Sequence, residues 1–285
     1  MKTIKKISEC KSIASKLREK GSIIGFVPTM GALHQGHLSL IRMAKKDCDK
    51  VFLSIFVNPI QFGPGEDYGS YPRDINRDAV LAEREGADYI FFPAAKEMYG
   101  ADHKTFVGVK ELEEIMCGKY RPGHFSGVAT VVLKLFNIIK AHRAYFGQKD
   151  YQQMIIIKKM AADLNMDIKI ETGPTIRERD GLAMSSRNKY LSAEEREDAV
   201  VLYESLNTVK NMVKSGEKNL EKIKRKVIKK LKKNRSVKRV DYFEFRDPRT
   251  LEERKKADRK QEGLLAATAV WIGKTRLIDN MVIKF

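Results

Sequence analysis

The first 175 residues of this chain alternate short apolar runs with stretches whose apolar residues recur at helical spacing. Val51–Val57 is almost unbroken in its apolar character, as expected of a strand that is buried on both faces of a parallel sheet. Ser22–Val27 and Ala87–Phe92 are similar runs, and each is followed by a proline. Such alternation indicates strands joined by crossover helices. We therefore expect an α/β fold with a Rossmann-like, doubly wound parallel sheet.

The other elements expected in this part follow from the same periodicities. Helices are expected at His37–Lys46, Ile75–Glu85, Val128–Lys140 and Tyr151–Asn165, and strands at Arg143–Phe146 and Ile168–Glu171. Ligands of such sheets bind outside the carboxyl ends of the strands. The segments that should carry the chemistry are therefore Pro28–His37, Asn58–Tyr71, Gly147–Asp150 and Gly173–Asn188.

The pattern changes after about residue 190, where helices and strands no longer alternate. Two helices are expected at Ala193–Val213 and Leu220–Lys233, followed by strands at Lys238–Phe245, Leu264–Ile272 and Arg276–Ile278. Segregated helices and strands indicate a second, smaller α+β domain. We place the larger domain at residues 1–178 and the smaller one at 179–285.

Composition excludes several classes of protein. The chain has 285 residues, of which 42% are hydrophobic and 32% charged, and no apolar stretch approaches the ~20 residues of a membrane-spanning helix. The first residues lack the apolar core of a signal peptide, so we do not expect export. The three cysteines are widely scattered and provide neither a disulfide framework nor a zinc-ligand spacing, which fits a cytoplasmic protein.

The formal net charge of +18 raises the question of nucleic-acid binding. Residues 210–239 carry fourteen Lys and Arg against two Glu, so most of the excess lies in one segment. Within it Leu220, Ile223, Val227 and Leu231 recur at helical spacing, which predicts an amphipathic helix with a solvated basic face. No aromatic residues interleave the lysines, so a base-stacking platform is not supported. An RNA-binding protein remains the alternative from a different functional class.

The segment Met30–His37 follows a strand and begins a helix. Gly31 allows a tight turn, and Gly36 leaves room for a phosphate or a base to approach the backbone. His34 and His37 are three residues apart, so they lie on one face of the helix start, beside backbone amides that attract phosphate. The sequence favours nucleotide binding here. The alternatives are that both histidines only cap the helix and pack, or that they bind a metal.

Three further polar segments suit the same chemistry. Asn58 and Gln61 end a strand with two amides, which can donate to a carboxylate and accept from a hydroxyl group. Lys149 can reach phosphates from the start of a helix. Ser185, Ser186 and Arg187 lie in a polar loop whose hydroxyls and guanidinium suit the β- and γ-phosphates, and such a loop can close as a lid.

At these residues the sequence resembles a known family. Pro28–His37 resembles the HxGH signature of the nucleotidyltransferase superfamily, which also includes class I aminoacyl-tRNA synthetases. Further blocks resemble the pantothenate synthetase (pantoate–β-alanine ligase) family, with Ile60 where that family usually has Thr. They are Phe56–Phe62, Tyr71–Asp74, Arg121–Phe125, Tyr145–Gln153 and Asp180–Asn188, then Ala266–Gly273 and Arg276–Asn280.

The resemblance implies the roles of individual residues. The implied ATP-binding residues are Met30, Gly31, Ala32, Leu33, His34, Gln35, Gly36, His37, Gly147, Gln148, Lys149, Asp150, Ile176, Met184, Ser185, Ser186 and Arg187. The implied pantoate-binding residues are Pro28, Thr29, Met30, Gln61 and Gln153, and those for β-alanine are Asn58 and Gln61. The implied catalytic residues are His34, His37 as proton donor, Lys149 and Arg187. No role is assigned to Arg121 or His124.

The resemblance also implies a reaction. Pantoate would be activated by ATP to a pantoyl adenylate, and the amine of β-alanine would then displace AMP. Mg²⁺ would accompany ATP with few protein ligands, and no dedicated metal site is expected. A homodimer is implied, without nucleic acid or membrane as a partner. The alternative enzyme is another HxGH adenylyltransferase, which would not need the amides at Asn58, Gln61 and Gln153.

Overall fold

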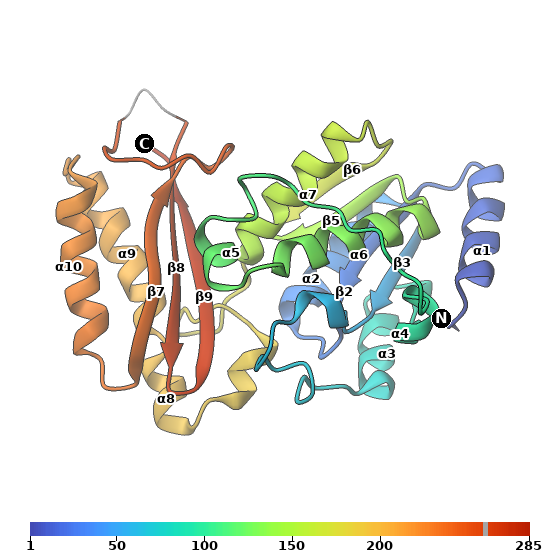
Figure 1. Ribbon diagram of the computed structural model, residues 1–285, viewed down its shortest axis with the longest axis horizontal. Coiled ribbons are helices and arrows are strands. Elements are labelled where there is room, and N and C mark those ends of the chain that lie inside the picture. The colour runs from blue at the N-terminus through green and yellow to red at the C-terminus, as the bar shows by residue number, and fades with distance from the viewer. Residues whose placement is uncertain (259–261) are drawn as a thin grey trace. The chain divides into compact units, whose positions relative to one another are not determined.

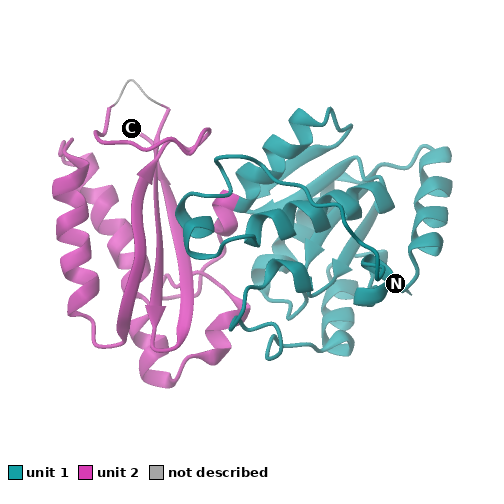
Figure 2. Ribbon diagram, in the orientation of Figure 1, with its two compact units in different colours: residues 1–148, 153–174 teal, residues 149–152, 175–285 magenta. Residues whose placement is uncertain are grey.

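The computed structural model describes residues 1–258 and 262–285. The chain forms two compact units, shown in Figure 2. Unit 1 comprises residues 1–148 and 153–174, and unit 2 comprises residues 149–152 and 175–285. No helix among the described residues is long and apolar enough to cross a membrane. The domain bounds predicted at residues 1–178 and 179–285 stay predictions.

Unit 1 is built on a parallel sheet of six strands in the order β1-β4-β3-β2-β5-β6 (Figure 1). The strands are β1 (Lys2–Ile4), β2 (Ile24–Thr29), β3 (Lys50–Ile55), β4 (Tyr89–Phe91), β5 (Arg143–Gly147) and β6 (Lys169–Gly173). Each neighbouring pair runs parallel. The predicted α/β fold class is therefore confirmed.

Helices flank this sheet, as crossover connections between parallel strands require. They are α1 (Ile7–Glu19), α2 (Gln35–Asp47), α3 (Ile75–Arg84), α4 (Ala95–Met98), α5 (Met116–Tyr120), α6 (His124–Ile139) and α7 (Tyr151–Asp163). The predicted elements are all present, with ends shifted by up to four residues. The sequence interpretation missed β1, α1, α4 and α5. β1 is too short for a period-2 pattern, and it is recognisable only from its pairing with β4.

The order of the strands decides where the turn after β2 lies in the sheet. From β2 the chain moves outward through β3 to β4, whereas β5 pairs with the other side of β2 and leads to β6. The direction of winding thus reverses between β2 and β5. The crevice of a doubly wound sheet lies at this reversal, outside the carboxyl ends of the strands. The segments that follow β2 and β5 are Met30–His37 and Gln148–Asp150, which carry most of the predicted ATP residues.

Unit 2 packs helices against an antiparallel sheet in the order β7-β8-β9. Its helices are α8 (Ala193–Asp198), α9 (Val201–Lys214) and α10 (Leu220–Lys233), and its strands are β7 (Val237–Arg246), β8 (Leu264–Ile272) and β9 (Thr275–Ile283). The strand β9 is much longer than the predicted Arg276–Ile278, because it pairs with β8 from Thr275 to Ile283. The length of such a strand is set by its pairing partner, and its ends are only weakly marked in the sequence.

The prediction of a single helix at Ala193–Val213 was wrong, since the structure divides this segment into α8 and α9. At the junction the Val200 N–H bonds to the Glu197 carbonyl and the Leu202 N–H to the Ala199 carbonyl. These bonds span three residues instead of four, so the helix tightens into a 3₁₀ turn there. The fully buried Ala199 lies at this break. Nothing in the local propensities marks it.

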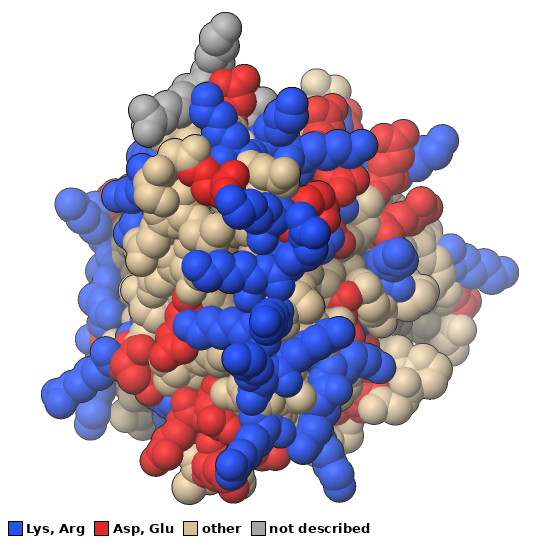
Figure 3. Space-filling view, turned by 90° about the vertical axis from the view of Figure 1, so that its left-hand side faces the viewer, with Lys and Arg blue, Asp and Glu red and all other residues tan. Residues whose placement is uncertain are grey.

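The basic helix α10 has the predicted amphipathic form. Leu220, Ile223, Val227 and Leu231 are all buried, and the helix packs against α9 and β7. Its lysines point outward, and Figure 3 shows Lys and Arg gathered on the side of the molecule that carries α10. The apolar stripe alone accounts for the folding of this segment.

Gly127 on α6 fixes the approach of the 3₁₀ turn η1 (Pro59–Gln61). A Cβ at residue 127 would lie 2.5 Å from the Ile60 carbonyl oxygen and 2.7 Å from the Gln61 Cα. Both contacts are with backbone, so a larger side chain must displace the turn.

We therefore predict that Gly127→Ala lowers the free energy of unfolding by about 1–3 kcal/mol through overpacking, although alanine is the better helix former. Urea unfolding checks this. Gly69→Ala is the matched control, because no atom lies within 4 Å of a Cβ placed there. An equal stability for both variants would contradict the steric argument.

Candidate active site

The turn after β2 has an unusual backbone. Gly31 and Ala32 both adopt left-handed conformations, with φ of 85° and 51°. The left-handed region is easily reached by glycine but costs energy in alanine. A Cβ at residue 31 would lie 2.9 Å from the Asp78 Oδ2 and 3.0 Å from the Ile55 side chain. The glycine predicted to make this turn is therefore required by both its φ and its surroundings.

The carboxylate of Asp78 holds this turn in place. Asp78 lies in the first turn of α3 and is 1% exposed. Its Oδ2 accepts from the Ala32 N–H at 2.7 Å and its Oδ1 from the Leu33 N–H at 2.9 Å. Burial raises the pKa of Asp78 from its ordinary value, although the two N–H groups oppose the shift. Sequence reasoning missed this residue, although a carboxylate on the buried side of a predicted helix was a usable signal.

The two histidines cap α2. The Nδ1 of His34 accepts from the Gly36 N–H at 3.1 Å, and the Nδ1 of His37 accepts from the His34 N–H at 3.4 Å. The ring centroids are 4.1 Å apart. Because both Nδ1 atoms accept hydrogen bonds, each neutral ring carries its proton on Nε2 and can donate from that atom. Capping and phosphate binding are thus compatible, since they use opposite nitrogens of each ring.

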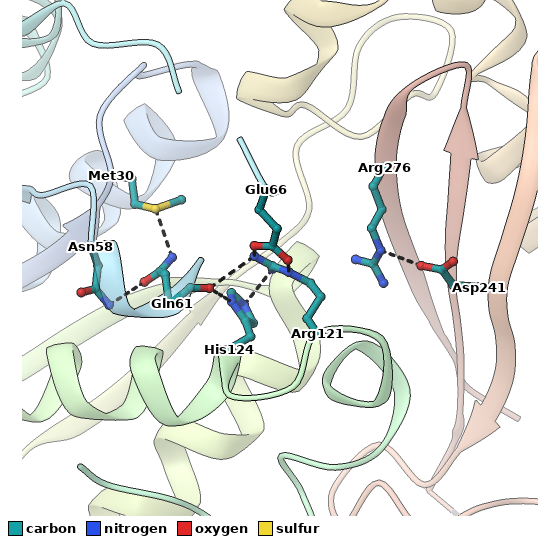
Figure 4. Close-up of polar contacts among 8 residues, drawn as sticks. All are labelled: Met30, Asn58, Gln61, Glu66, Arg121, His124, Asp241 and Arg276. Atoms are coloured by element: carbon teal, nitrogen blue, oxygen red, sulfur yellow. Dashed lines mark hydrogen bonds and ion pairs between the residues drawn. The ribbon is translucent and has the colours of Figure 1, made fainter. Parts of the chain in front are cut away.

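Figure 4 shows the amides that follow β3. The Asn58 Nδ2 donates to the Gln61 Oε1 and to the Gly127 carbonyl, each at 3.0 Å, and the Asn58 Oδ1 accepts from the Tyr99 hydroxyl at 2.8 Å. Burial raises the pKa of Tyr99, which keeps this donor protonated. The Gln61 Nε2 lies 3.1 Å from the Met30 sulfur. Asn58 therefore orients Gln61, and Gln61 turns its amide toward Met30, the residue after β2.

Arg121 and His124, whose roles the sequence left open, form a polar cluster with Glu66 (Figure 4). Arg121 donates from Nε to Glu66 Oε1 at 2.6 Å and forms a second bond to Oε2. Its Nη1 lies 3.0 Å from the His124 Nε2, and the His124 Nδ1 lies 2.8 Å from the Gln61 carbonyl. Burial acts to raise the pKa of Glu66, but the bonds and charge of Arg121 outweigh it and hold that pKa below its ordinary value.

The remaining predicted residues of unit 1 lie on β2, β5 and α7. Pro28 and Thr29 end β2, and the Thr29 hydroxyl donates to the Ser54 carbonyl. Gly147 ends β5, Gln148 begins the next turn, and Gln153 lies half-buried in the first turn of α7. Within unit 1 the Gln61 amide thus lies beside Met30, which begins the segment Met30–His37 (the histidine turn).

In unit 2 the loop with the other predicted ATP residues is a small hairpin. The Met184 N–H donates to the Ile176 carbonyl at 3.0 Å, and the Glu178 N–H donates to the Leu182 carbonyl at 2.8 Å. The hairpin leads into a 3₁₀ turn at Ser186–Tyr190, where the Ser185 hydroxyl oxygen accepts from the Arg187 N–H. Ile176 and Met184–Arg187, which are separate in sequence, are therefore adjacent.

Lys149 and Asp150 also belong to unit 2. The Lys149 Nζ lies 3.9 Å from an Asp150 carboxylate oxygen. A small cavity of this unit is lined by Lys149, Ser185 and Asn188, among others. Within residues 1–258 and 262–285 no group of three or more His, Cys, Asp or Glu could hold a metal ion.

The fold and these groups define an α/β protein with a polar, glycine-containing turn at the switch point of a doubly wound sheet. The family model of pantoate-beta-alanine ligase matches residues 2–282. The pantothenate synthetase of Caldicellulosiruptor bescii is 57% identical over 284 residues, covering 100% of this chain and 99% of that protein. That of Thermotoga petrophila is 53% identical over 283 residues, covering 99% and 100%.

Two solved structures are similar along almost the whole chain. Pantothenate synthetase from Thermus thermophilus has a TM-score of 0.92 and 41% identity, with 99% of each chain covered. Pantoate-beta-alanine ligase from Francisella tularensis, complexed with beta-gamma ATP and beta-alanine, has a TM-score of 0.82 and 38% identity, covering 99% of this chain and 97% of that one. The chain belongs to the pantoate-beta-alanine ligase family, and it is a ligase.

We predict that Asp78→Asn lowers the free energy of unfolding by about 1–3 kcal/mol, because the amide nitrogen cannot accept and leaves a buried N–H unpaired. Urea unfolding measures the loss. Asp163→Asn, which changes an exposed carboxylate of α7, is the control. Equal stability of Asp78→Asn and the wild type would refute the role assigned to this carboxylate.

The lowered pKa of Glu66 predicts a pH dependence. A carboxylate with a depressed pKa stabilises the folded state above its unfolded pKa of about 4.3, and that stabilisation is lost as the pH falls through the folded value. We expect Glu66→Gln to cost about 1 kcal/mol at pH 7. The difference from wild type should vanish in acid. Urea unfolding at a series of pH values tests this, and a difference that does not change with pH would count against it.

Proposed function

We propose that this chain condenses (R)-pantoate with β-alanine at the cost of ATP, through a pantoyl adenylate, and releases AMP and pyrophosphate. The observation that carries the proposal is the 3.1 Å approach of the Gln61 amide to Met30 at the start of the histidine turn. It places a group suited to a hydroxy-carboxylate beside a group suited to phosphates. Family membership and the Francisella complex with its ATP ligand and beta-alanine support the same reaction.

In the proposed first step the pantoate carboxylate attacks the α-phosphorus of ATP, and pyrophosphate leaves. Negative charge gathers on the phosphoryl oxygens, so catalysis consists mainly of positioning and of fixed donors. The Nε2–H groups of His34 and His37 would supply donors, and Lys149 and Arg187 would supply cations. Because the Nδ1 atoms are held by backbone N–H groups, the rings are oriented before ATP binds.

Gln61 and Gln153 would hold pantoate, and the backbone at Pro28–Met30 would line its position. Asn58 is saturated by Tyr99, Gln61 and Gly127. Asn58 would therefore act on β-alanine indirectly, by orienting Gln61, and Gln61 would contact both pantoate and β-alanine. In the second step the β-alanine amine attacks the acyl carbon and AMP leaves. An adenylate is a good acyl donor, so no serine or cysteine nucleophile is required.

Mg²⁺ would neutralise phosphate charge in this proposal. The described residues contain no metal-binding cluster, so the ion would be held chiefly by phosphate oxygens and water. The remaining parts of the proposal are a homodimer in the cytoplasm and closure of the loop at Met184–Arg187 over the phosphates.

The central test is pantoate-dependent exchange of pyrophosphate into ATP. We predict that His37→Ala lowers the exchange rate by about 100-fold or more, the usual effect of losing one preorganised donor to charge that develops in the transition state. His142→Ala is the control, because its Nδ1 accepts from the Ile24 N–H at the amino end of β2. Exchange that does not depend on pantoate would refute the ligase proposal. A full rate in His37→Ala would refute the role of that residue.

The same assay separates the ligase proposal from the alternative of an RNA-binding protein. Neutralising Lys229, Lys230, Lys232 and Lys233 on α10 should leave the exchange rate unchanged if the basic face is only a solvated surface.

A further inference from the structure

The closing motif Arg276–Asn280 resembles the family pattern, yet no role has been assigned to any of its residues. It lies on β9, and Asp279 and Asn280 are 2% and 3% exposed. Burying a carboxylate and an amide in a small sheet is costly unless both are satisfied. Their partners are therefore informative.

Asp279 binds the hairpin that carries the predicted phosphate loop. Its two oxygens accept from Arg177 Nη1 at 2.6 Å and Nη2 at 2.9 Å. Arg177 lies in the first arm of the hairpin, bridged to Ala183, and also donates from Nη1 to the Gly181 carbonyl at 3.0 Å. Its guanidinium lies 4.4 Å from the Tyr203 ring centroid. This bidentate geometry leaves the hairpin little freedom.

Asn280 binds the other predicted phosphate segment. Its Nδ2 donates to the Lys149 carbonyl at 2.8 Å, and its backbone carbonyl lies 3.3 Å from Arg177 Nη2. Burial raises the pKa of Asp279, and the charges of Arg177 and Lys149 oppose that shift. The small cavity of unit 2 has Lys149, Ser185, Asn188 and Asp279 in its wall. Two segments that are distant in sequence thus meet at one dipeptide.

We propose that Asp279 and Asn280 are positioning residues for the triphosphate of ATP, which hold Lys149 and the Ile176–Arg187 hairpin at a fixed spacing on the rigid edge of β9. The inference rests on the proposed function and deepens it. Neither side chain need touch ATP. The competing explanation is that the dipeptide only stabilises unit 2.

ATP and AMP distinguish the two explanations, because only ATP has the β- and γ-phosphates. We expect Asp279→Asn to weaken ATP binding by about tenfold or more, since a charge-assisted bidentate bond is lost, and to change AMP binding by less than about twofold. Calorimetry measures both affinities. The rate of pantothenate formation from supplied pantoyl adenylate and β-alanine should remain within about twofold of wild type, because that step needs no triphosphate.

Asp241→Asn is the matched control. Asp241 is another buried, arginine-paired carboxylate of the same sheet, bonded to Arg276 at 2.7 Å (Figure 4). It should leave the ratio of ATP to AMP affinity unchanged. Asn280→Ala is the second variant and retains the Arg177–Asp279 pair, so it tests the Lys149 arm even if Asp279→Asn does not fold.

The positioning role would be overturned if Asp279→Asn or Asn280→Ala lost affinity for ATP and for AMP equally. It would also be overturned if neither variant lost affinity for ATP. Wild-type protein without pantoate-dependent exchange would instead refute the proposed function, and the ATP-to-AMP comparison would still test the role of β9 in nucleotide binding.

Discussion

The turn after β2 depends on one buried carboxylate. Two consecutive left-handed residues present the Ala32 and Leu33 N–H groups to the protein interior, where no strand or helix can accept them. Buried N–H groups without partners are costly, so this backbone requires an acceptor with two oxygens at one position. Asp78 supplies it from α3. The positions of Met30 before the turn and of His34 and His37 after it follow from that contact.

The same arrangement recurs at the other groups of the site. Asn58 is saturated by protein groups, and it fixes Gln61 instead of remaining open to solvent. Asp279 does the same for Arg177. In each case a buried polar side chain holds a second, less buried polar side chain in place. Such support restricts the rotamers of the outer group and reduces the ordering needed on binding.

The elements predicted correctly from the sequence are those whose burial pattern is local to the segment. Leu220–Lys233 and Leu264–Ile272 were predicted with their observed bounds. In both segments the order of apolar and polar residues along the chain indicates which residues are buried. The break between α8 and α9, the full length of β9 and the existence of β1 were not predicted. The length of β9 is decided by its pairing with β8 and the existence of β1 by its pairing with β4, which local propensity does not report.

The sequence by itself determined the fold class, the strand–turn–helix at Pro28–His37 and the family, because periodicity and short motifs are local properties. Only the tertiary structure decided which polar groups support the candidate site. Asp78 reaches Ala32 across 46 residues and Asp279 reaches Arg177 across 102. A hydrogen bond depends on distances of about 3 Å, and no spacing along the chain encodes such a distance between remote residues.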